Sequence, residues 1–156
     1  MNKKVYIEFG VGDVYKRIKK HALENYYTIV IGNQSTLTIY QEAYNENKFL
    51  VDKRINGDWN DEYDIPKADK WSCISCFEHI KPENIDKSLI GIIKKIKKDS
   101  LGNIHIDLSD HYPYTPYLNK IKSNEWKNII SKYFTFTYKE YPSSISFEEV
   151  SVKNDI

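Results

Sequence analysis

The stretch Lys4-Val-Tyr-Ile-Glu-Phe-Gly-Val-Gly-Asp13 joins the first two structural elements of the chain and is the starting point for its fold. Apolar residues at alternate positions predict a β-strand over residues 4–9 with one buried face. Two glycines then interrupt the pattern, which indicates a turn. The aspartate that follows is suited to capping a helix, and the four-residue spacing of apolar side chains extends this helix to about Glu24.

A strand, a Gly-x-Gly turn and a helix in this order are also the context of a dinucleotide-binding fingerprint. The third glycine of that fingerprint is absent, because Tyr15 stands in its place. The segments that follow favour an antiparallel meander rather than a parallel strand–helix–strand unit. We therefore interpret Gly10 and Gly12 as turn residues before a helix start that could hold an anion, and we expect no cofactor.

The remaining elements follow from hydrophobic periodicity and from turn residues. Strands are predicted at residues 4–9, 26–31, 36–40, 48–51, 104–108, 133–138 and 145–152. Helices are predicted at residues 13–24, at residues 82–98 with a lysine run in the last turn, and from Ser123 onward. Residues 55–81 show no period and are interpreted as a long loop. Within the last strand the apolar residues change phase, so Glu148-Glu149 is predicted to form a β-bulge.

Strands that are grouped, rather than alternating regularly with helices, predict an α+β fold. We expect a single domain over residues 1–156, with a mostly antiparallel sheet of six to seven strands and about three helices. The 156 residues match the usual size of one domain, and 40% hydrophobic residues are sufficient for a packed core.

The charge and the apolar segments exclude several classes of protein. A net charge of +1 argues against a dedicated nucleic-acid binder, which usually carries a basic excess. No apolar signal-peptide core and no membrane-spanning run are present in the sequence, so a cytoplasmic protein without membrane contact is expected.

Cys73-Ile-Ser-Cys76, extended by His79, has the spacing of a metal or redox motif. A structural zinc site needs four ligands, usually in two pairs, and the second pair is missing. A redox site needs a preceding buried strand, which residues 66–71 do not resemble. We interpret the two cysteines as reduced, partly buried thiols and expect no bound metal.

Residues 105–111 contain the densest group of side chains suited to catalysis. A strand over residues 104–108 would place His105 and Asp107 on the same face, with Asp110 and His111 at its exit. Such a group could bind a divalent metal or pair a base with a carboxylate. It could equally be the polar face of an amphipathic strand, and no catalytic residue is assigned.

The clearest charge segregation lies in the predicted loop. Residues 28–69 carry 4 basic and 8 acidic side chains, a net charge of −4, between two basic flanks. Aromatic side chains surrounded by charge are typical of protein interfaces. The following residues are therefore predicted to bind a protein partner: Asp58, Trp59, Asp61, Glu62, Tyr63 and Asp64. A solvated acidic loop with two aromatic side chains packed on the core is the alternative.

In size, composition and the acidic-aromatic segment 58–64, the chain resembles bacterial toxin-immunity proteins of the contact-dependent growth inhibition and polymorphic toxin type. The resemblance implies a non-catalytic protein, not an enzyme, that binds and neutralises one cognate toxin domain. A toxin with nuclease activity and a basic cleft would suit the acidic loop. The alternative function is a small metal-dependent hydrolase that uses His105, Asp107, Asp110 and His111.

Overall fold

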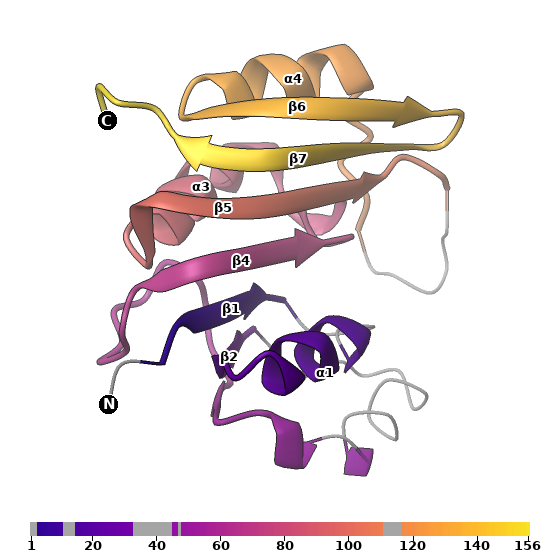
Figure 1. The fold of residues 1–156 in the computed structure, drawn as a ribbon. Coiled ribbons are helices and arrows are strands. Elements are labelled where there is room, and N and C mark those ends of the chain that lie inside the picture. The colour runs from indigo at the N-terminus through magenta and orange to yellow at the C-terminus, as the bar shows by residue number, and fades with distance from the viewer. Residues whose placement is uncertain (1–2, 11–14, 33–44, 47, 111–116) are drawn as a thin grey trace.

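The computed structural model describes residues 3–10, 15–32, 45–46, 48–110 and 117–156, and its strands form one sheet (Figure 1). The strands are β1 (Val5–Phe9), β2 (Tyr27–Ile31), β3 (Lys53–Ile55), β4 (Ala68–Ile74), β5 (Ile96–Asp107), β6 (Phe134–Tyr141) and β7 (Ser144–Val152). The α-helices are α1 (Tyr15–Leu23), α3 (Pro82–Ile93) and α4 (Ser123–Ser131), and two 3₁₀ turns are η1 (Lys48–Leu50) and η2 (Phe77–His79).

The sheet has the strand order β3-β2-β1-β4-β5-β7-β6. The five strands from β3 to β5 are parallel, whereas β7 is antiparallel to both of its neighbours. The chain winds outward from β1 to β3 and then crosses to β4 on the other side of β1. In an open α/β sheet this reversal creates a crevice at the carboxyl ends of the strands, which is where such folds bind ligands.

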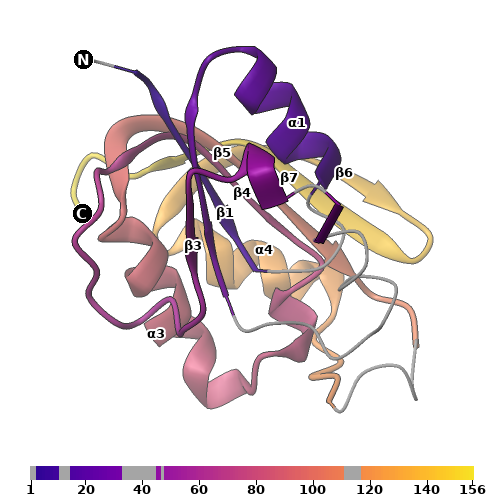
Figure 2. The same cartoon turned by 90° about the horizontal axis from the view of Figure 1, so that it is seen from below.

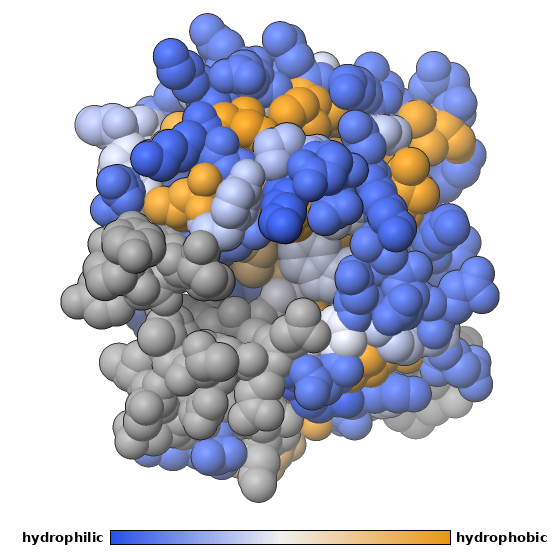
Figure 3. All heavy atoms as spheres, turned by 180° about the vertical axis from the view of Figure 1, so that it is seen from behind, coloured by the Kyte–Doolittle hydropathy of each residue, from blue (hydrophilic) through white to orange (hydrophobic). Residues whose placement is uncertain are grey.

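Helices lie on both sides of the sheet, with α1 on one side and α3 and α4 on the other (Figure 2). The side with two helices holds the main core, in which Trp71, Phe77 and Trp126 are fully buried. Gly102 in β5 is part of this packing, because a Cβ atom there would lie 2.0 Å from the Trp71 indole. The outward surface of this side is mostly hydrophilic, with small separate hydrophobic groups (Figure 3).

The opposite side of the sheet is covered unevenly. Helix α1 lies over β1 and β2, and no helix among the described residues lies over β4, β5, β7 and β6 on that side (Figures 1 and 2). The side chains of β5 alternate accordingly: Gly102, Ile104 and Ile106 are buried, whereas Leu101 and Asn103 are exposed. Strand β5, which pairs in parallel with β4, therefore has one buried face and one partly exposed face.

The number of elements agrees with the expectation from sequence. Seven strands and three α-helices are found among the described residues, and a mixed sheet is consistent with the α+β class. The predicted bulge at Glu148-Glu149 is confirmed, because the β5–β7 register shifts there and Glu149 has a φ of 51°. The mostly antiparallel sheet is only partly correct, since it holds for β5, β7 and β6 alone.

Four predictions for the middle of the chain are wrong. Lys48–Leu50 form the turn η1, so residues 48–51 are not a strand. Among the described residues β2 pairs with β3 in parallel, which is not the pairing of an antiparallel meander. Residues 55–81 include β4, the central strand of the sheet. Helix α3 ends at Ile93, and the following lysines lie in a turn and at the start of β5. The strand predicted at residues 36–40 lies outside the described residues.

No helix in the described part of the chain has the length and the apolar character needed to cross a membrane.

Candidate functional site

The carboxyl ends of β1 and β2 approach each other through two glycines. The Gly10 amide donates a hydrogen bond to the carbonyl of Ile31 at 2.7 Å, and the Gly32 amide donates to the carbonyl of Ile55 at 3.1 Å. A Cβ atom at Gly32 would lie 3.0 Å from the Gly10 Cα, which leaves no room for a side chain between the two strands. Gly10 also has a φ of +106°, which only glycine adopts without strain.

Two side chains from distant segments close around Gly10. A Cβ atom there would lie 2.3 Å from Cys76 Sγ and 3.7 Å from the Trp59 ring. The indole of Trp59 donates a hydrogen bond to the carbonyl of Ile31 at 3.2 Å. Ser75 precedes Cys76 with a φ of 55°, an uncommon conformation for a residue with a side chain and one that is enriched at functional sites. These contacts surround the backbone of Gly10, which carries no side chain, at the point between β1 and β4 where the strand order reverses.

A buried ion pair fixes helix α1 against β1 just beside this point. Glu8, which is 1% exposed, accepts hydrogen bonds from Arg17 at 2.9 and 3.2 Å and from the Tyr6 hydroxyl at 2.6 Å. Burial and the neighbouring Glu8 charge raise the pKa of Tyr6 well above its ordinary value, so the hydroxyl remains a donor. The Tyr6 ring in turn stacks on His21 of α1, with centroids 3.8 Å apart.

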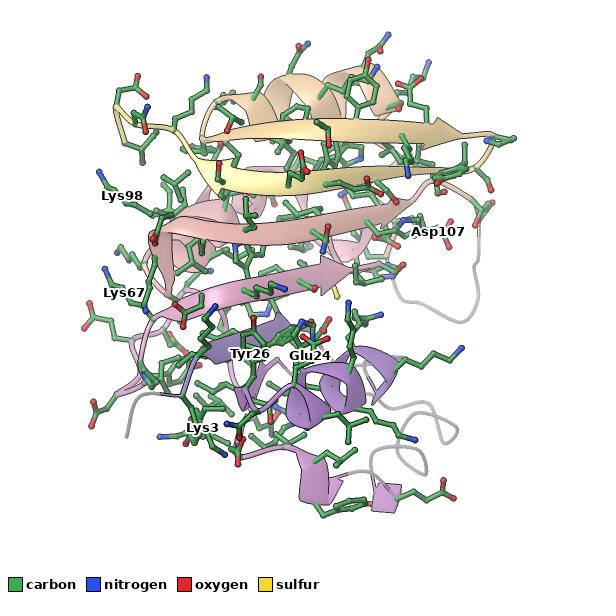
Figure 4. All side chains as sticks on the ribbon, viewed as in Figure 1. Lys3, Glu24, Tyr26, Lys67, Lys98 and Asp107 are labelled. Carbon is green, nitrogen blue, oxygen red and sulfur yellow. The ribbon has the colours of Figure 1, made fainter. Side chains whose placement is uncertain are left out.

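A cavity of about 310 Å³ opens next to this point, at the carboxyl ends of β4 and β5. Its lining residues are Glu78, Asp107, Leu108, Ser109, Asp110, Leu118, Asn119, Lys120, Ile121, Lys122 and Ser123. Figure 4 labels Asp107 at the end of β5. Asp107 accepts hydrogen bonds from the Ser109 amide at 2.9 Å and from the Ser109 hydroxyl at 2.6 Å, which orient its carboxylate.

Glu78 is the most buried carboxylate of the cavity, at 3% exposure. Neither of its oxygens makes a hydrogen bond of normal geometry to a described residue. Its pKa is raised from 4.5 to about 7, mainly by burial and also by the charge of Asp107, although the backbone amides of Glu78 and Asp107 oppose the shift. A carboxyl group with this pKa exchanges its proton near neutral pH.

The segment after the cavity rim is held onto η2 by Asn119. Its side-chain amide donates to the carbonyls of Phe77 and Ile80, both at 2.8 Å, and its backbone amide donates to the carbonyl of Glu78 at 2.9 Å. Lys120 follows with a φ of 58°. The side chain of Glu78 is therefore enclosed between β5 and this segment.

The predicted partner-binding residues divide into two groups in the structure. Trp59 is 8% exposed and packs edge-to-face on Phe9 and Phe77. The carboxylate-bearing residues are exposed: Asp58, Asp61, Glu62 and Asp64. Tyr63 donates its hydroxyl to the Asp58 carbonyl at 2.7 Å, and the Lys95 ammonium lies 5.5 Å from the Tyr63 ring centroid. Whether this loop contacts a protein stays a prediction.

The group at residues 105–111 is only partly brought together. His105 lies on the sheet face, with its Nδ1 atom 2.6 Å from the Ser146 hydroxyl, and burial lowers its pKa although Asp107 opposes the shift. Asp107 and Asp110 instead line the cavity with Glu78. His111 lies outside the described residues. No three His, Cys, Asp or Glu side chains in the described ranges are grouped as metal ligands would be.

The cysteines lie beside the glycines and are not bonded to each other. Cys73 is fully buried, and burial together with the neighbouring Cys76 raises its pKa well above the ordinary value. Cys76 is half-buried, and its thiol lies 3.2 Å from the Ile74 carbonyl. His79 directs its Nδ1 atom to the carbonyl of Tyr117 at 2.9 Å, away from both thiols.

Comparison with known proteins gives a structural relationship without a sequence relationship. No family model matches the chain, and no curated protein is significantly similar. Among solved structures, the Burkholderia thailandensis 1,6-didemethyltoxoflavin-N1-methyltransferase, with bound 1,6-didemethyltoxoflavin and S-adenosylhomocysteine, has a TM-score of 0.68 and 12% identity. That match covers 96% of this chain and 72% of the methyltransferase.

Two other solved structures support the same architecture. The PH0226 protein from Pyrococcus horikoshii OT3 has a TM-score of 0.74 and 11% identity, with 98% of this chain and 84% of that chain covered. The methyltransferase CalO6 has a TM-score of 0.68 and 13% identity, with 95% of this chain and 57% of that chain covered.

These findings overturn the function expected from sequence. The resemblance to toxin-immunity proteins is wrong, and so are the non-catalytic function and the toxin partner, because methyltransferases that share the fold are enzymes and one of them holds a small molecule. The metal-dependent hydrolase is contradicted as well. The sequence feature that agrees with the observed parallel sheet is Gly10-Val-Gly12 after a strand. The absent third glycine at Tyr15 and the antiparallel strands expected after it both argued against a cofactor.

Glu78 is a second functional candidate, and no sequence motif marks it. It lies only two residues after Cys76, inside the segment that was interpreted as a loop. At 7 to 13% identity the relationship establishes the architecture only. The chain has the seven-stranded fold of the two methyltransferases described above.

Proposed function

We propose that this protein is a methyltransferase that uses S-adenosylmethionine and acts on a small molecule. The observation that carries the proposal is Gly10, which lies with a φ of +106° at the carboxyl end of β1, where the strand order reverses between β1 and β4. Gly32, at the end of the neighbouring β2, packs against the Gly10 backbone. Ligands of open α/β sheets bind at this position. The methyltransferase relatives by fold, one of them with S-adenosylhomocysteine bound, give the class of ligand.

Close packing shapes the backbone on which a nucleoside ligand would lie. Cys76 and Trp59 fill the space that a side chain at Gly10 would need, and the Gly10 backbone fills that space at Gly32. Cys76 forms the wall toward β4, and its half-buried position leaves part of this wall accessible. The Glu8–Arg17 pair holds α1 in place and thereby the turn that precedes it.

When bound, the cofactor supplies an electrophilic methyl group on a sulfonium. The contribution of the chain is to bind, to orient and to exclude water. The carboxyl end of β1 around Gly10 would hold the cofactor, while the cavity at the ends of β4 and β5 would hold the acceptor. The segment at residues 76–79 separates the two, with Cys76 on the side of Gly10 and Glu78 on the side of Asp107.

Isothermal titration calorimetry with S-adenosylhomocysteine tests the cofactor site directly. We expect saturable binding by the natural chain and loss of binding in Gly10→Val, because the added side chain would meet Cys76. Gly57→Ala is the matched control, since its new Cβ atom would meet only the movable hydroxyl end of Tyr63. Failure of the natural chain to bind would contradict the proposal.

This proposal replaces the expectation that the protein has no cofactor. The small-molecule substrate likewise replaces the expected toxin partner. The cytoplasmic location stays a prediction.

A further inference from the structure

We propose that the cavity at the ends of β4 and β5 binds a hydroxyl group of the methyl acceptor, and that Glu78 accepts the proton of this hydroxyl. The inference rests on the proposed methyltransferase function and extends it by naming the acceptor chemistry and the residue that handles the proton. Its basis is a carboxylate that is buried beside a cavity and whose oxygens make no hydrogen bond of normal geometry to a described residue.

The unsatisfied oxygens of Glu78 are the first step of the argument. A buried carboxylate normally gains hydrogen bonds or a counter-charge, because leaving it unpaired is costly. Both Glu78 oxygens are buried and lack such bonds to described residues, and the nearest basic side chain in the described part of the chain is His79, whose Nε2 lies 3.9 Å from Oε2. Because neither oxygen is accessible in this conformation, a donor in the adjacent cavity would supply the missing hydrogen bond once the Glu78 side chain turns toward it.

The other lining groups define the kind of donor. Leu108, Leu118 and Ile121 give the cavity an apolar part, and its volume of about 310 Å³ lies at the lower end of the range of small-molecule sites, roughly 300–1,000 Å³. Lys120 and Lys122 also line it together with Asp107 and Asp110, so charged groups of both signs surround the ligand space and favour neither a cation nor an anion. A neutral hydroxyl can donate to the ionised form of Glu78 and accept from the protonated form, so it suits both states.

The environment of Glu78 matches the transfer of a proton near neutral pH. The charged and titratable groups around it come from every neighbouring element: Cys73 in β4, His79 in η2, Asp107 and Asp110 after β5, and Lys120 and Lys122 in the segment beyond. Burial is the largest cause of its raised pKa, and Asp107 adds to the shift. A general base is most effective when its pKa lies near the working pH.

The transfer balances without a further reactant. The acceptor O–H bond breaks and its proton passes to a carboxylate oxygen of Glu78. The electron pair left on the acceptor oxygen forms the new bond to the methyl carbon, while the electron pair of the broken sulfur–carbon bond stays on sulfur. Glu78 then releases the proton to solvent or product.

The test observes the carboxyl group itself by ¹³C NMR of protein labelled at the glutamate side-chain carboxyl carbons. In the natural chain we expect one carboxyl resonance that titrates with a midpoint near pH 7. This resonance should be absent in Glu78→Gln and present in Glu83→Gln, the control variant at an exposed position in the first turn of α3. Phenol should lower this midpoint by at least about half a pH unit, because a hydrogen bond to the ionised form favours it. Anisole, which has the same ring and no hydroxyl hydrogen, should leave it unchanged.

Several results would overturn the inference. Equal effects of phenol and anisole, or no effect of either, would show that Glu78 does not face a bound hydroxyl. A larger shift with benzylammonium than with phenol would assign the cavity to amines instead. Binding of S-adenosylhomocysteine to the natural chain and to Glu78→Gln is measured in parallel. If the natural chain does not bind S-adenosylhomocysteine, the proposed function is contradicted. If it binds S-adenosylhomocysteine but phenol does not lower the Glu78 midpoint, only the role of Glu78 is contradicted.

Discussion

Glu78→Gln should make the protein more stable at alkaline pH relative to the natural chain, and this gain should vanish in acid. The natural carboxyl group has its pKa raised from 4.5 to about 7 by burial and by Asp107. Between these two values the folded protein keeps a proton that the unfolded chain releases, so the free energy of unfolding falls as pH rises. Glutamine has nearly the same shape and cannot ionise, which removes this dependence.

The magnitude follows from the size of the shift. Each pH unit within the window costs about 1.4 kcal/mol, so the natural chain should lose about 3 kcal/mol between pH 4.5 and pH 7 relative to the variant. At 156 residues this corresponds to a difference in Tm of roughly 6–12 °C, since 1 kcal/mol shifts Tm by roughly 2–4 °C in proteins of this size. Above about pH 8 the difference should be constant.

Urea unfolding followed by circular dichroism at half-unit steps from pH 4.5 to pH 9 measures this difference. The slope against pH is the informative quantity, because a glutamine amide in the cavity can add an offset that does not depend on pH. Glu83→Gln changes an exposed position and keeps Glu78, so it serves as the control and should follow the pH dependence of the natural chain. A stability difference between the natural chain and Glu78→Gln that is flat across this range would refute the argument from burial.

Three further predictions concern Gly10, the thiol of Cys76 and the ion pair between Glu8 and Arg17. Gly10→Ala should weaken the binding of S-adenosylhomocysteine in calorimetry. Adding Cys76→Ala to this variant removes the clash with the thiol and should restore part of the affinity. It should not restore all of it, because the φ of +106° still disfavours a side chain at position 10. Maleimide should label the half-buried Cys76 and not the buried Cys73 in the folded protein, as followed by mass spectrometry. Bound S-adenosylhomocysteine should slow the labelling of Cys76. Equal labelling of both thiols would contradict this prediction. Arg17→Met should lower the free energy of unfolding by about 3 kcal/mol, because it leaves Glu8 buried without its counter-charge. The loss should be smaller in the double variant with Glu8→Gln, and an equal loss in both would argue against the ion pair as the cause.

The local elements of the fold were predictable, whereas the strand pairing was not. Val5–Phe9, Tyr15–Leu23 and Ser123–Ser131 form where the periodicity indicates, because each has one apolar face and recognisable ends. Parallel strands usually have helices on both faces and then appear as continuous apolar runs. The antiparallel sheet was expected because strands predicted at residues 26–31, 36–40 and 48–51 follow one another without a helix, whereas Lys48–Leu50 form η1 and β2 pairs with β3 in parallel.

The site residues were obscured for a related reason. The strand Ala68–Ile74 carries the charged residues Asp69 and Lys70 near its start and follows an irregular segment, so its central place in the sheet is set by tertiary contacts. Because this strand was not predicted, nothing in the sequence placed Cys76 and Glu78 at the carboxyl end of a strand. The aromatic ring of Trp59 was correctly singled out, but a sequence does not distinguish an aromatic residue that packs inward from one that meets a partner.

The mixed sheet also has a consequence for how the protein folds. The β6–β7 hairpin pairs residues only a few positions apart, such as Tyr141 with Ser144, whereas β1 must find β4 across more than sixty residues. Contacts between distant residues form more slowly because a longer loop must close first. We expect the hairpin to gain protection from hydrogen exchange early in refolding, and the backbone around Gly10 and Gly32 to gain it last. The proposed cofactor would then bind only after the chain has completed its slowest step, and would report that folding is finished.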